Sequence, residues 1–302
     1  MSTALDVSAA AVEPGGTVVA APGLARRVWK NRAVVVGGGL LLAIVFVALA
    51  APWISPYDPY AQDLANRNVP PFWYDAGSWL HPLGTDPLGR DYLSRLFYGA
   101  RISLLIGISV ALISGLIGTT MGMLAGYFGG KTDMLVSFMV TTRLAMPVIL
   151  VALATVALVG GSLWVVIGVL GLLKWDRFAV VMRSATQQVR SLDYVAAAQA
   201  AGASTARVLL GEVLPNVLPH LVVVATLEAA SAILLEAALS FLGLGVQPPL
   251  PSWGLMISEA KSYMFFSFWL IALPGAALAT LIFAINLAGD GLRDLLAPEG
   301  RV

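Results

Sequence analysis

Long uncharged stretches dominate the pattern of hydrophobic and polar positions along this 302-residue chain. The first stretch runs from Ala33 to Ala51, and as a helix it would cover about 28 Å, enough to cross the hydrocarbon core of a bilayer. A cleaved signal peptide is the rival interpretation. The stretch is too long for the apolar part of a signal peptide, however, and Pro52-Trp53 makes a poor cleavage site. The pattern therefore predicts an uncleaved transmembrane helix over residues 33–51.

Five further hydrophobic stretches follow a polar segment. That segment, residues 52–101, carries proline, asparagine, aromatic residues and both signs of charge, and we expect it to face water. The five stretches are Ile102–Ala125, Met134–Gly160, Ser162–Val181, Val217–Leu242 and Phe266–Ala288. Lys174, Asp176 and Arg177 interrupt the second half of the fourth stretch. The sequence thus predicts an all-α membrane protein with six transmembrane helices.

Lysine and arginine near the ends of these spans predict the orientation of the chain. A basic cluster, Arg26 to Arg32, precedes the first span, and such clusters are typical of the cytoplasmic side. Six crossings then place both termini in the cytoplasm, and the segments 52–101 and 243–265 on the outside. The expected organisation is a cytosolic N-terminal tail 1–32, the first transmembrane helix 33–51, an extracytoplasmic segment 52–101, a five-helix core 102–288 with an inner loop 183–216, and a cytosolic C-terminal tail 289–302.

Composition supports a lipid-facing protein and excludes several functions. The chain is 58% hydrophobic and 12% charged, whereas soluble domains carry about 25% charged residues. A net charge of +1 argues against nucleic-acid binding, which needs a basic face. The absence of cysteine excludes disulfides, iron–sulfur clusters and thiolate zinc sites. The two histidines, His81 and His220, lie far apart in the sequence, and we expect no metal site.

The inner loop between the fourth and fifth spans contains the most informative sequence, DYVAAAQAAGASTARVLLGEVLP, from Asp193 to Pro215. Alanine is the best helix former, Asp193 is a suitable N-cap, and Pro215 should stop or bend a second short helix after the turn at Gly202. The first helix presents almost no side-chain bulk, because it contains Ala196, Ala197, Ala198, Ala200 and Ala201. Small side chains allow close approach to another protein, so we expect this helix to dock in a groove of a partner. Packing on its own bundle is the alternative.

This loop resembles the EAA loop of bacterial ABC-importer permeases, which reads E-A-A-x-x-x-G followed by a hydrophobic stretch that ends in Leu-Pro. The chain matches with Ala196-Ala197-Ala198, Gly202 and Leu214-Pro215 at the same spacing. In that family the loop forms a cytoplasmic coupling helix that lies in a cleft of the ATP-hydrolysing subunit. Ala196 replaces the glutamate of the family, so a charged contact with the ATPase is either absent or supplied by another residue such as Asp193.

Three further stretches are similar to the dipeptide and oligopeptide permease C proteins of the peptide branch. They are HPLGTDPLGRDYLSRLFYGARISL from His81, LSFLGLGVQPPLPSWG from Leu239, and GDGLRDLLAP from Gly289 to Pro298. Their order and spacing match, and only the N-terminal tail lies outside the resemblance. Val180 departs from the family, which usually has an arginine after Phe178-Ala179, whereas Arg183 matches.

The resemblance implies the type I ABC importer permease fold, the bacterial inner membrane, and the import of di- or oligopeptides. It also implies a homologous second permease, two cytosolic ATPases that bind ATP and Mg²⁺, an extracytoplasmic peptide-binding protein, and no cofactor or catalytic residue in this chain. Import of a nickel or other metal chelate, or of an opine, by the same architecture is an alternative. An ion-coupled secondary transporter and a membrane enzyme are rivals from other classes, and the chain lacks a nucleophile–base or metal constellation that would favour an enzyme.

Three other features allow more than one interpretation. The segment from Ala125 to Thr132 fits a relaxed phosphate-loop pattern, but it follows a predicted transmembrane helix rather than a strand, so we expect no nucleotide site there.

Glu228 and Glu236 lie in the fifth span and are about 80° apart around a helix. They either line the translocation path, or are buried acids bonded to neighbouring helices, or lie near the outer interface. Pro147 and Pro274, in the third and sixth spans, either shape the pore or only curve their helices.

Overall fold

A computed structural model describes residue 29 and residues 31–296 of the chain. The predicted basic residues Arg26, Arg27 and Lys30, most of the N-terminal tail and the end of the C-terminal tail lie outside the described residues. Within them the structure is helical, and the only strand-like pairing is an isolated bridge between Thr85 and Asp91. The longer helices are α2 (Arg32–Ile54), α3 (Tyr92–Phe128), α4 (Gly130–Leu144), α5 (Val148–Val159), α6 (Leu163–Leu173), α7 (Asp176–Arg190), α10 (Leu214–Phe241) and α12 (Trp269–Leu296).

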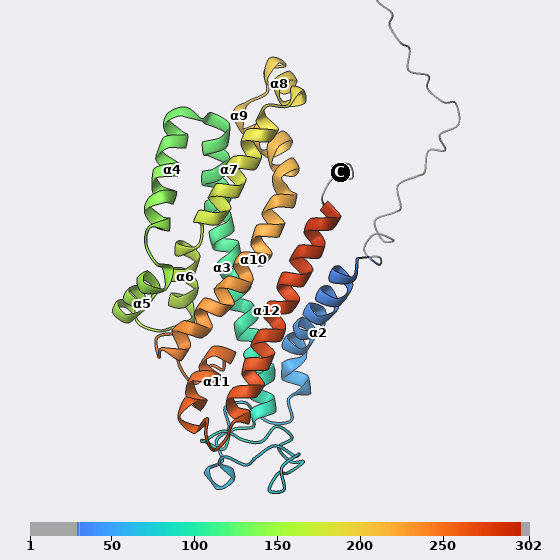
Figure 1. The fold of residues 1–302 in the computed structure, drawn as a ribbon, viewed down its shortest axis with the longest axis vertical. Helices are drawn as coiled ribbons and strands as arrows, with labels where there is room; N and C mark the ends of the chain where they lie inside the picture. The colour runs from blue at the N-terminus through green and yellow to red at the C-terminus, as the bar shows by residue number, and fades with distance from the viewer. Residues whose placement is uncertain (1–28, 30, 297–302) are drawn as a thin grey trace, which may run out of the picture.

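Short helical segments complete the chain between these elements. They are η1 (Leu64–Asn66), α8 (Asp193–Ala200), α9 (Thr205–Arg207), the π-helical turn η2 (Val208–Val213), α11 (Trp253–Ala260) and η3 (Lys261–Tyr263). Figure 1 shows α8 and α9 at one end of an elongated bundle, and α11 at the other end together with the irregular segment between α2 and α3.

Four continuous helical stretches are long and apolar enough to cross a membrane, namely α2, α3, α12 and the run Thr205–Phe241 that contains α10. The third predicted span is instead two helices, because α4 and α5 meet at an angle of 81°. Pro147 is the N-cap of α5 and stands at this break, as expected of a residue that cannot continue the preceding helix. The fourth predicted span is also broken, at Lys174 and Trp175 between α6 and α7.

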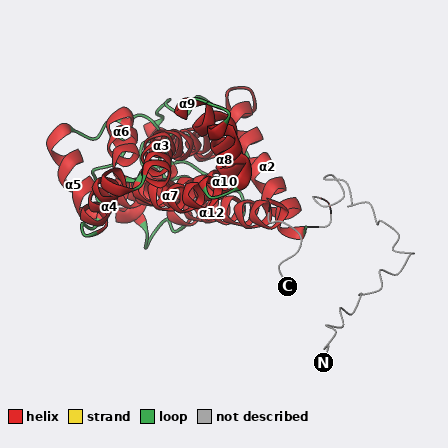
Figure 2. Cartoon of the chain, turned by 90° about the horizontal axis from the view of Figure 1, so that it is seen from above, coloured by secondary structure: helices red, strands yellow, loops and turns green. Residues whose placement is uncertain are grey.

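Helix α3 lies at the centre of the bundle, and a stripe of glycines lets α7 approach it closely (Figures 1 and 2). A Cβ atom added at Gly118 would lie 2.2 Å from the carbonyl oxygen of Trp175, and one at Gly122 would lie 2.5 Å from that of Ala179. Gly126 continues the series against Arg183, at 2.6 Å. Small residues spaced four apart are typical of membrane helices that pack backbone to backbone.

The first and last long helices pack against each other by a second glycine contact. A Cβ at Gly37 of α2 would lie 2.5 Å from the backbone of Ala288, and one at Gly291 of α12 would lie 2.5 Å from the side chain of Val34. The N-terminal end of α2 and the C-terminal end of α12 therefore lie side by side. Both ends point toward the end of the molecule that carries α8 (Figure 1).

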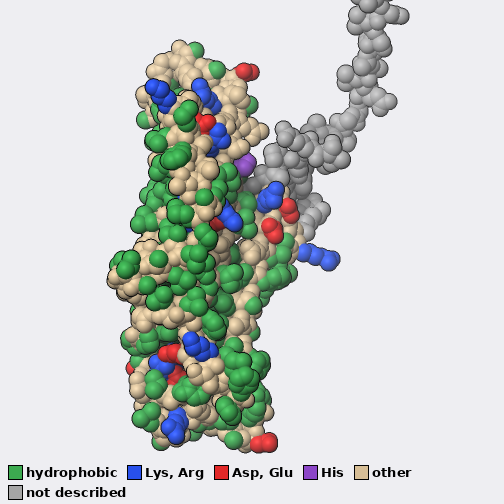
Figure 3. Space-filling model, turned by 60° about the vertical axis from the view of Figure 1, so that its left-hand side comes forward, with side chains coloured by type: hydrophobic (Ala, Val, Ile, Leu, Met, Phe, Trp, Pro, Cys, Tyr) green, Lys and Arg blue, Asp and Glu red, His purple; other side chains and the backbone are tan. Residues whose placement is uncertain are grey.

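Several predicted boundaries move in the structure. Helix α3 begins at Tyr92 instead of Ile102, so the irregular polar segment is residues 55–91 and not 52–101. Helix α12 continues through the first residues of the predicted C-terminal tail, as far as Leu296. With 37 residues, α3 is about 55 Å long, which exceeds the hydrocarbon core of about 30 Å, so it extends beyond the membrane. The first turns of α3 contain Arg95 and Arg101, so the hydrophobic pattern placed the start of this span later, at Ile102. Charged side chains are visible at both ends of the molecule, and a further group lies between them (Figure 3).

Candidate functional site

The predicted small-residue helix is present as α8, at the extreme end of the molecule (Figure 1). Ala196, Ala197 and Ala200 are exposed, and Ala198 is half-buried. The predicted role of Asp193 as N-cap is wrong by one position, because Leu192 is the N-cap and makes no side-chain bond. Asp193 is instead the first residue of the helix. In the first turn its negative charge interacts favourably with the positive end of the helix dipole, and the residue remains exposed.

Gly202 ends α8 in the conformation that the sequence pattern requires. Its φ is +80°, a left-handed value that glycine adopts without steric cost. The backbone N–H of Ala203 donates to the carbonyl of Ala198 at 3.1 Å, and that of Gly202 donates to Gln199 at 3.0 Å, so carbonyls at the helix end are satisfied. The predicted tight turn between two helices is confirmed.

Of the two alternatives predicted for Pro215, a stop and a bend, the stop is wrong, because the helical run continues. The run Thr205–Phe241 is continuous, and Pro215 lies in the first turn of α10 directly after η2. A proline ring clashes with the carbonyl four residues before it. The wider π-helical turn moves the carbonyls away from their usual positions, and the side-chain Nδ2 of Asn216 donates to the carbonyl of Glu212 at 2.6 Å. The inner loop is thereby joined to the fifth span by a continuous helical run.

Helix α8 is attached to the bundle on one side only. Val195 is fully buried among side chains of α7, η2 and α10. The side-chain Nε2 of Gln199 donates to the hydroxyl of Tyr127 on α3, at 3.0 Å. Arg190 lies over the ring of Tyr127, 5.8 Å from its centroid. One face of α8 is thus fixed, while its alanine face is left free on the surface of the chain.

Glu236 is buried in α10 and bonded within the chain. Its Oε1 accepts a hydrogen bond from Ser240 at 2.6 Å and another from Ser252 at 3.0 Å. Ser252 also caps α11 by accepting from the N–H of Leu255. This geometry corresponds to the second alternative given above, a buried acid bonded to neighbouring elements.

Glu228 is also buried, but it belongs to a charged group. Its Oε2 lies 2.7 Å from Lys174 Nζ, and its Oε1 lies 3.3 Å from Arg177 Nη1. Lys174 also donates to Ser231 at 2.8 Å. The basic residues that interrupt the fourth predicted span are therefore the partners of an acid in the fifth. Whether Glu228 or Glu236 lines the translocation path stays a prediction.

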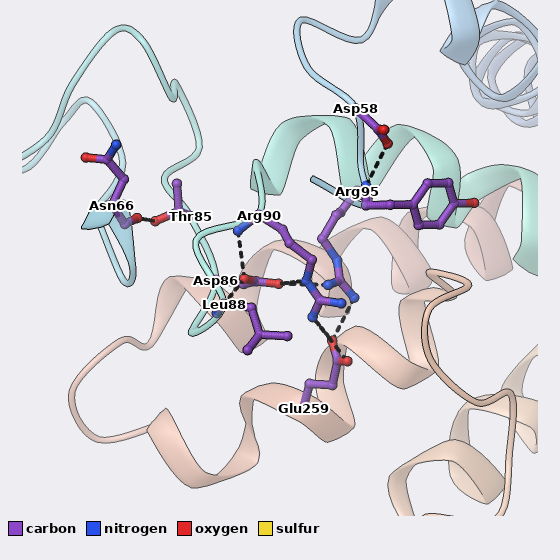
Figure 4. A network of polar contacts seen from close by, with 9 residues as sticks. Asp58, Asn66, Thr85, Asp86, Leu88, Arg90, Arg95 and Glu259 are labelled. Carbon is purple, nitrogen blue, oxygen red and sulfur yellow. Dashed lines mark hydrogen bonds and ion pairs between the residues drawn. The ribbon is translucent and has the colours of Figure 1, made fainter. Parts of the chain in front are cut away.

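The opposite end of the molecule holds a buried ion-pair network that the sequence did not reveal. We call Asp86, Arg90, Arg95 and Glu259 the Asp86 network (Figure 4). Oδ2 of Asp86 accepts from Arg90 Nε at 2.6 Å and from Arg95 Nη1 at 2.7 Å. Oε2 of Glu259 accepts from Arg90 Nη2 at 3.1 Å and from Arg95 Nη2 at 2.7 Å. Two cations and two anions are thus joined, and the network ties the segment before α3 to α11.

The signal for part of this network was present in the stretch that begins at His81, where aspartate and arginine recur among glycines and prolines. Its fourth member, Glu259, is more than 160 residues away, and no spacing rule connects it to the others. Burial raises the pKa of the Glu259 carboxyl above its ordinary value, although Arg90 partly offsets this effect.

The fold and these sites define a class: an all-helical, multi-pass membrane protein whose exposed helix lies at one end of the bundle and whose polar loops lie at the other. Two family models match the chain. The model described as binding-protein-dependent transport system inner membrane component matches residues 118–302, and that of the N-terminal TM domain of oligopeptide transport permease C matches residues 24–71. The chain belongs to the family of binding-protein-dependent transport system inner membrane components.

Curated relatives align over most of their own length. The chain is 44% identical over 264 residues to the di/tripeptide transport system permease protein DppC of Pseudomonas aeruginosa strain UCBPP-PA14. This alignment covers 87% of each of the two chains. It is 43% identical over 270 residues to the dipeptide transport system permease protein DppC of Escherichia coli strain K12, covering 89% of this chain and 90% of the relative. The resemblance derived from the sequence motifs is confirmed.

A solved structure shares the fold. The inward-facing MetNI methionine ABC transporter matches with a TM-score of 0.57 and 19% identity, over 68% of this chain and 98% of that chain. The predicted all-α fold of a type I ABC importer permease is therefore confirmed. The chain is a multi-pass inner membrane component and not a self-contained enzyme.

Proposed function

We propose that this chain is one of two transmembrane subunits of an ATP-driven importer of di- or oligopeptides. A homologous second permease forms the other half of the translocation path, two cytosolic ATPases bind ATP and Mg²⁺, and an extracytoplasmic protein delivers the peptide. The substrates named for the two DppC relatives support the peptide assignment. The chain itself performs no covalent chemistry in this proposal.

The observation that carries the proposal is the exposed alanine face of α8. Ala197 and Ala200 would place little bulk between the α8 backbone and an ATPase groove, so the two backbones could approach closely. Val195 on the opposite face fixes α8 to the bundle, so a displacement of α8 is passed on to α7 and α10. The coupling contact in this proposal consists of Asp193, Ala196, Ala197, Ala198 and Gly202, with Leu214 and Pro215 joining the segment to the fifth span.

In this proposal α8 lies in the cytoplasm, together with both termini. The ends of α2 and α12 that point toward α8 support a common side for these three features (Figure 1). The segment 55–91 and α11 then face the outside, where the binding protein arrives. Closure of the ATPases on ATP would bring two coupling helices together and favour the outward-open arrangement of the bundles, as a shift between two populated states.

The test is uptake of a labelled dipeptide by the complete importer in proteoliposomes with its binding protein. Ala197→Trp should reduce ATP-dependent uptake at least about tenfold, because a bulky group in a packed interface prevents docking. Ala197→Ser, which keeps the side chain small, serves as the matched control. Gly202→Trp should act in the same direction, and its insertion into the membrane should be unchanged. Normal uptake by both stably inserted tryptophan variants would contradict the docking model.

The same preparation also tests the cargo. Mass spectrometry of the ligand that copurifies with the complex and its binding protein should identify a di- or oligopeptide. Recovery of a metal chelate or an opine instead would assign one of the alternative substrates. Uptake that persists after ATP is depleted would favour an ion-coupled transporter.

A further inference from the structure

Two helix breaks meet inside the bundle. One separates α4 from α5, and the other separates α6 from α7. Nε of Arg143, in the last turn of α4, donates to the carbonyl oxygen of Leu173 at 2.8 Å, and its Nη1 donates to that of Met146 at 3.2 Å. Arg143 thus satisfies backbone carbonyls at both breaks. Non-helical backbone at membrane depth occurs only where protein buries it or where it lines a water-filled cavity.

The position of Glu228 gives the level of these breaks along α10. Glu228 stands midway along α10, about 20 Å from each end of the helix at 1.5 Å per residue. Lys174, at the second break, is 2.7 Å from Glu228, and Arg143 contacts the preceding residue, Leu173. At about 42 Å, α10 is longer than the hydrocarbon core of about 30 Å, and both breaks lie inside the bundle, away from the two ends of α10.

Five charged residues gather at this level, and we call them the midspan cluster: Arg143, Lys174, Asp176, Arg177 and Glu228. Three are basic and two are acidic. Lys174 and Glu228 are buried against each other, with side chains 9% and 1% exposed. Arg177 differs, because its side chain is 67% exposed and its one ion pair among the described residues is the 3.3 Å contact with Glu228. Most of its hydrogen-bond donors therefore point away from the chain.

An open pocket of about 280 Å³ lies beside this guanidinium. Asp176, Arg177 and Glu228 contribute its polar part, and apolar side chains of α4, α7 and α10 form the remainder. A charged side chain in the middle of a bilayer is costly unless it faces protein or water, and such residues mark substrate pathways. An exposed guanidinium beside the middle of a membrane-spanning helix favours a face of α7 and α10 that is covered by protein or water.

We propose that the midspan cluster is a binding site on the wall of the translocation path for the C-terminal carboxylate of a passing peptide, with Arg177 as its exposed ligand. This inference rests on the proposed function. A guanidinium can bind a carboxylate through two parallel hydrogen bonds, and the excess of one basic residue in the cluster favours an anion. Glu228 pairs with Lys174 and lies 3.3 Å from Arg177, so it is a positioning residue that does not touch the peptide.

The first test is the accessibility of position 177 to water. The chain contains no cysteine, so a single introduced thiol reports its own position and the parent chain is the blank. Arg177→Cys, in the complete transporter in lipid nanodiscs, should react with a membrane-impermeant anionic thiosulfonate. Transported peptide should slow this reaction at least about threefold, whereas a C-terminally amidated peptide should slow it less. Phe283→Cys is the control, because Phe283 on α12 is similarly exposed, at 57%, but apolar.

The second test is transport from preloaded binding protein in proteoliposomes. Arg177→Gln should lower uptake of a peptide with a free carboxylate by about tenfold, the size expected for loss of a hydrogen bond to a charged group. Arg177→Lys should restore part of the loss because it keeps the charge. As Arg177 is mostly exposed, neither variant disturbs interior packing, and assembly is checked by size-exclusion chromatography.

The outcomes separate this inference from the proposed function. If wild-type transporter imports peptide with ATP but Arg177→Cys does not react in either the presence or the absence of ATP, position 177 is not in the path and the inference is wrong. Reaction without protection by peptide, together with normal uptake by Arg177→Gln, contradicts carboxylate binding. Failure of the wild type itself to import peptide would contradict the proposed function, and the variants would not be needed to see it.

Discussion

The guanidinium of Arg95 donates to the carboxylate of Asp86 at 2.7 Å, and both side chains are almost completely buried, at 1% and 4% exposure. Arg95 belongs to the first turn of α3, and Asp86 to the irregular segment before it. Through Glu259 the same guanidinium also contacts α11. One residue of the central helix therefore connects the two polar segments at this end of the molecule.

Removal of this arginine should be strongly destabilising. Arg95→Met leaves Asp86 with Arg90 alone in a buried position, and breaking a buried ion pair from one side costs about 3–5 kcal/mol. The thermal midpoint of the purified complex, followed by loss of soluble protein, should fall clearly. Arg101→Met, at an exposed position on the same helix, is the control and should change the midpoint little. Equal midpoints for the two variants would show that the Asp86 network adds no stability.

The pH dependence of stability should contain a contribution from Glu259. Its pKa is raised in the folded protein, so the folded state holds the proton at a higher pH than the unfolded state does. Stability from this group is therefore fully present below the unfolded pKa and is lost as pH rises through the folded pKa. The midpoint of wild type relative to Glu259→Gln should increase as pH falls from about 7 toward about 4.5, the region just above the ordinary pKa of a glutamate. A constant difference would contradict the shift.

Two glycines should respond to alanine substitution with opposite signs. At Gly122 an added methyl would lie 2.5 Å from the carbonyl of Ala179, so Gly122→Ala should force α3 and α7 apart and cost about 1–3 kcal/mol. At Gly168 of α6 no atom lies within 4 Å of the added methyl, and Gly168→Ala should stabilise by up to about 1 kcal/mol through helix propensity. Thermal midpoints of the two variants test the glycine stripe directly, and a shift of the same sign in both would be inconsistent with it.

The attachment of α8 should determine the efficiency of coupling. Val195→Ala removes two buried carbons, which costs about 1.5 kcal/mol and loosens α8 on the bundle. Peptide imported per ATP hydrolysed should decrease, because movement of the ATPases is then passed on incompletely. Val159→Ala, the same substitution at a valine of α5 that is 64% exposed, is the matched control. An unchanged ratio in Val195→Ala would show that Val195 does not transmit the movement.

The sequence alone determined the helices and turns that depend only on the residues within them. An uncharged stretch such as 33–51 predicts its own helix, since its length and apolarity suffice to span a bilayer. The alanines around Ala197 and the glycine at 202 predicted α8 and its end, because helix propensity and a left-handed turn depend on the residues themselves. Several motifs in a fixed order also predicted the family, which the comparisons confirmed.

Tertiary structure decided whatever depends on a distant partner. The break at Lys174 occurs inside a stretch that was predicted as one span, and its partners, Arg143 of α4 and Glu228 of α10, come from other helices. Glu259 completes the Asp86 network from the far side of the chain. A charge in an apolar region requires a partner, but its spacing in the sequence does not say which one, because only folding brings the two together.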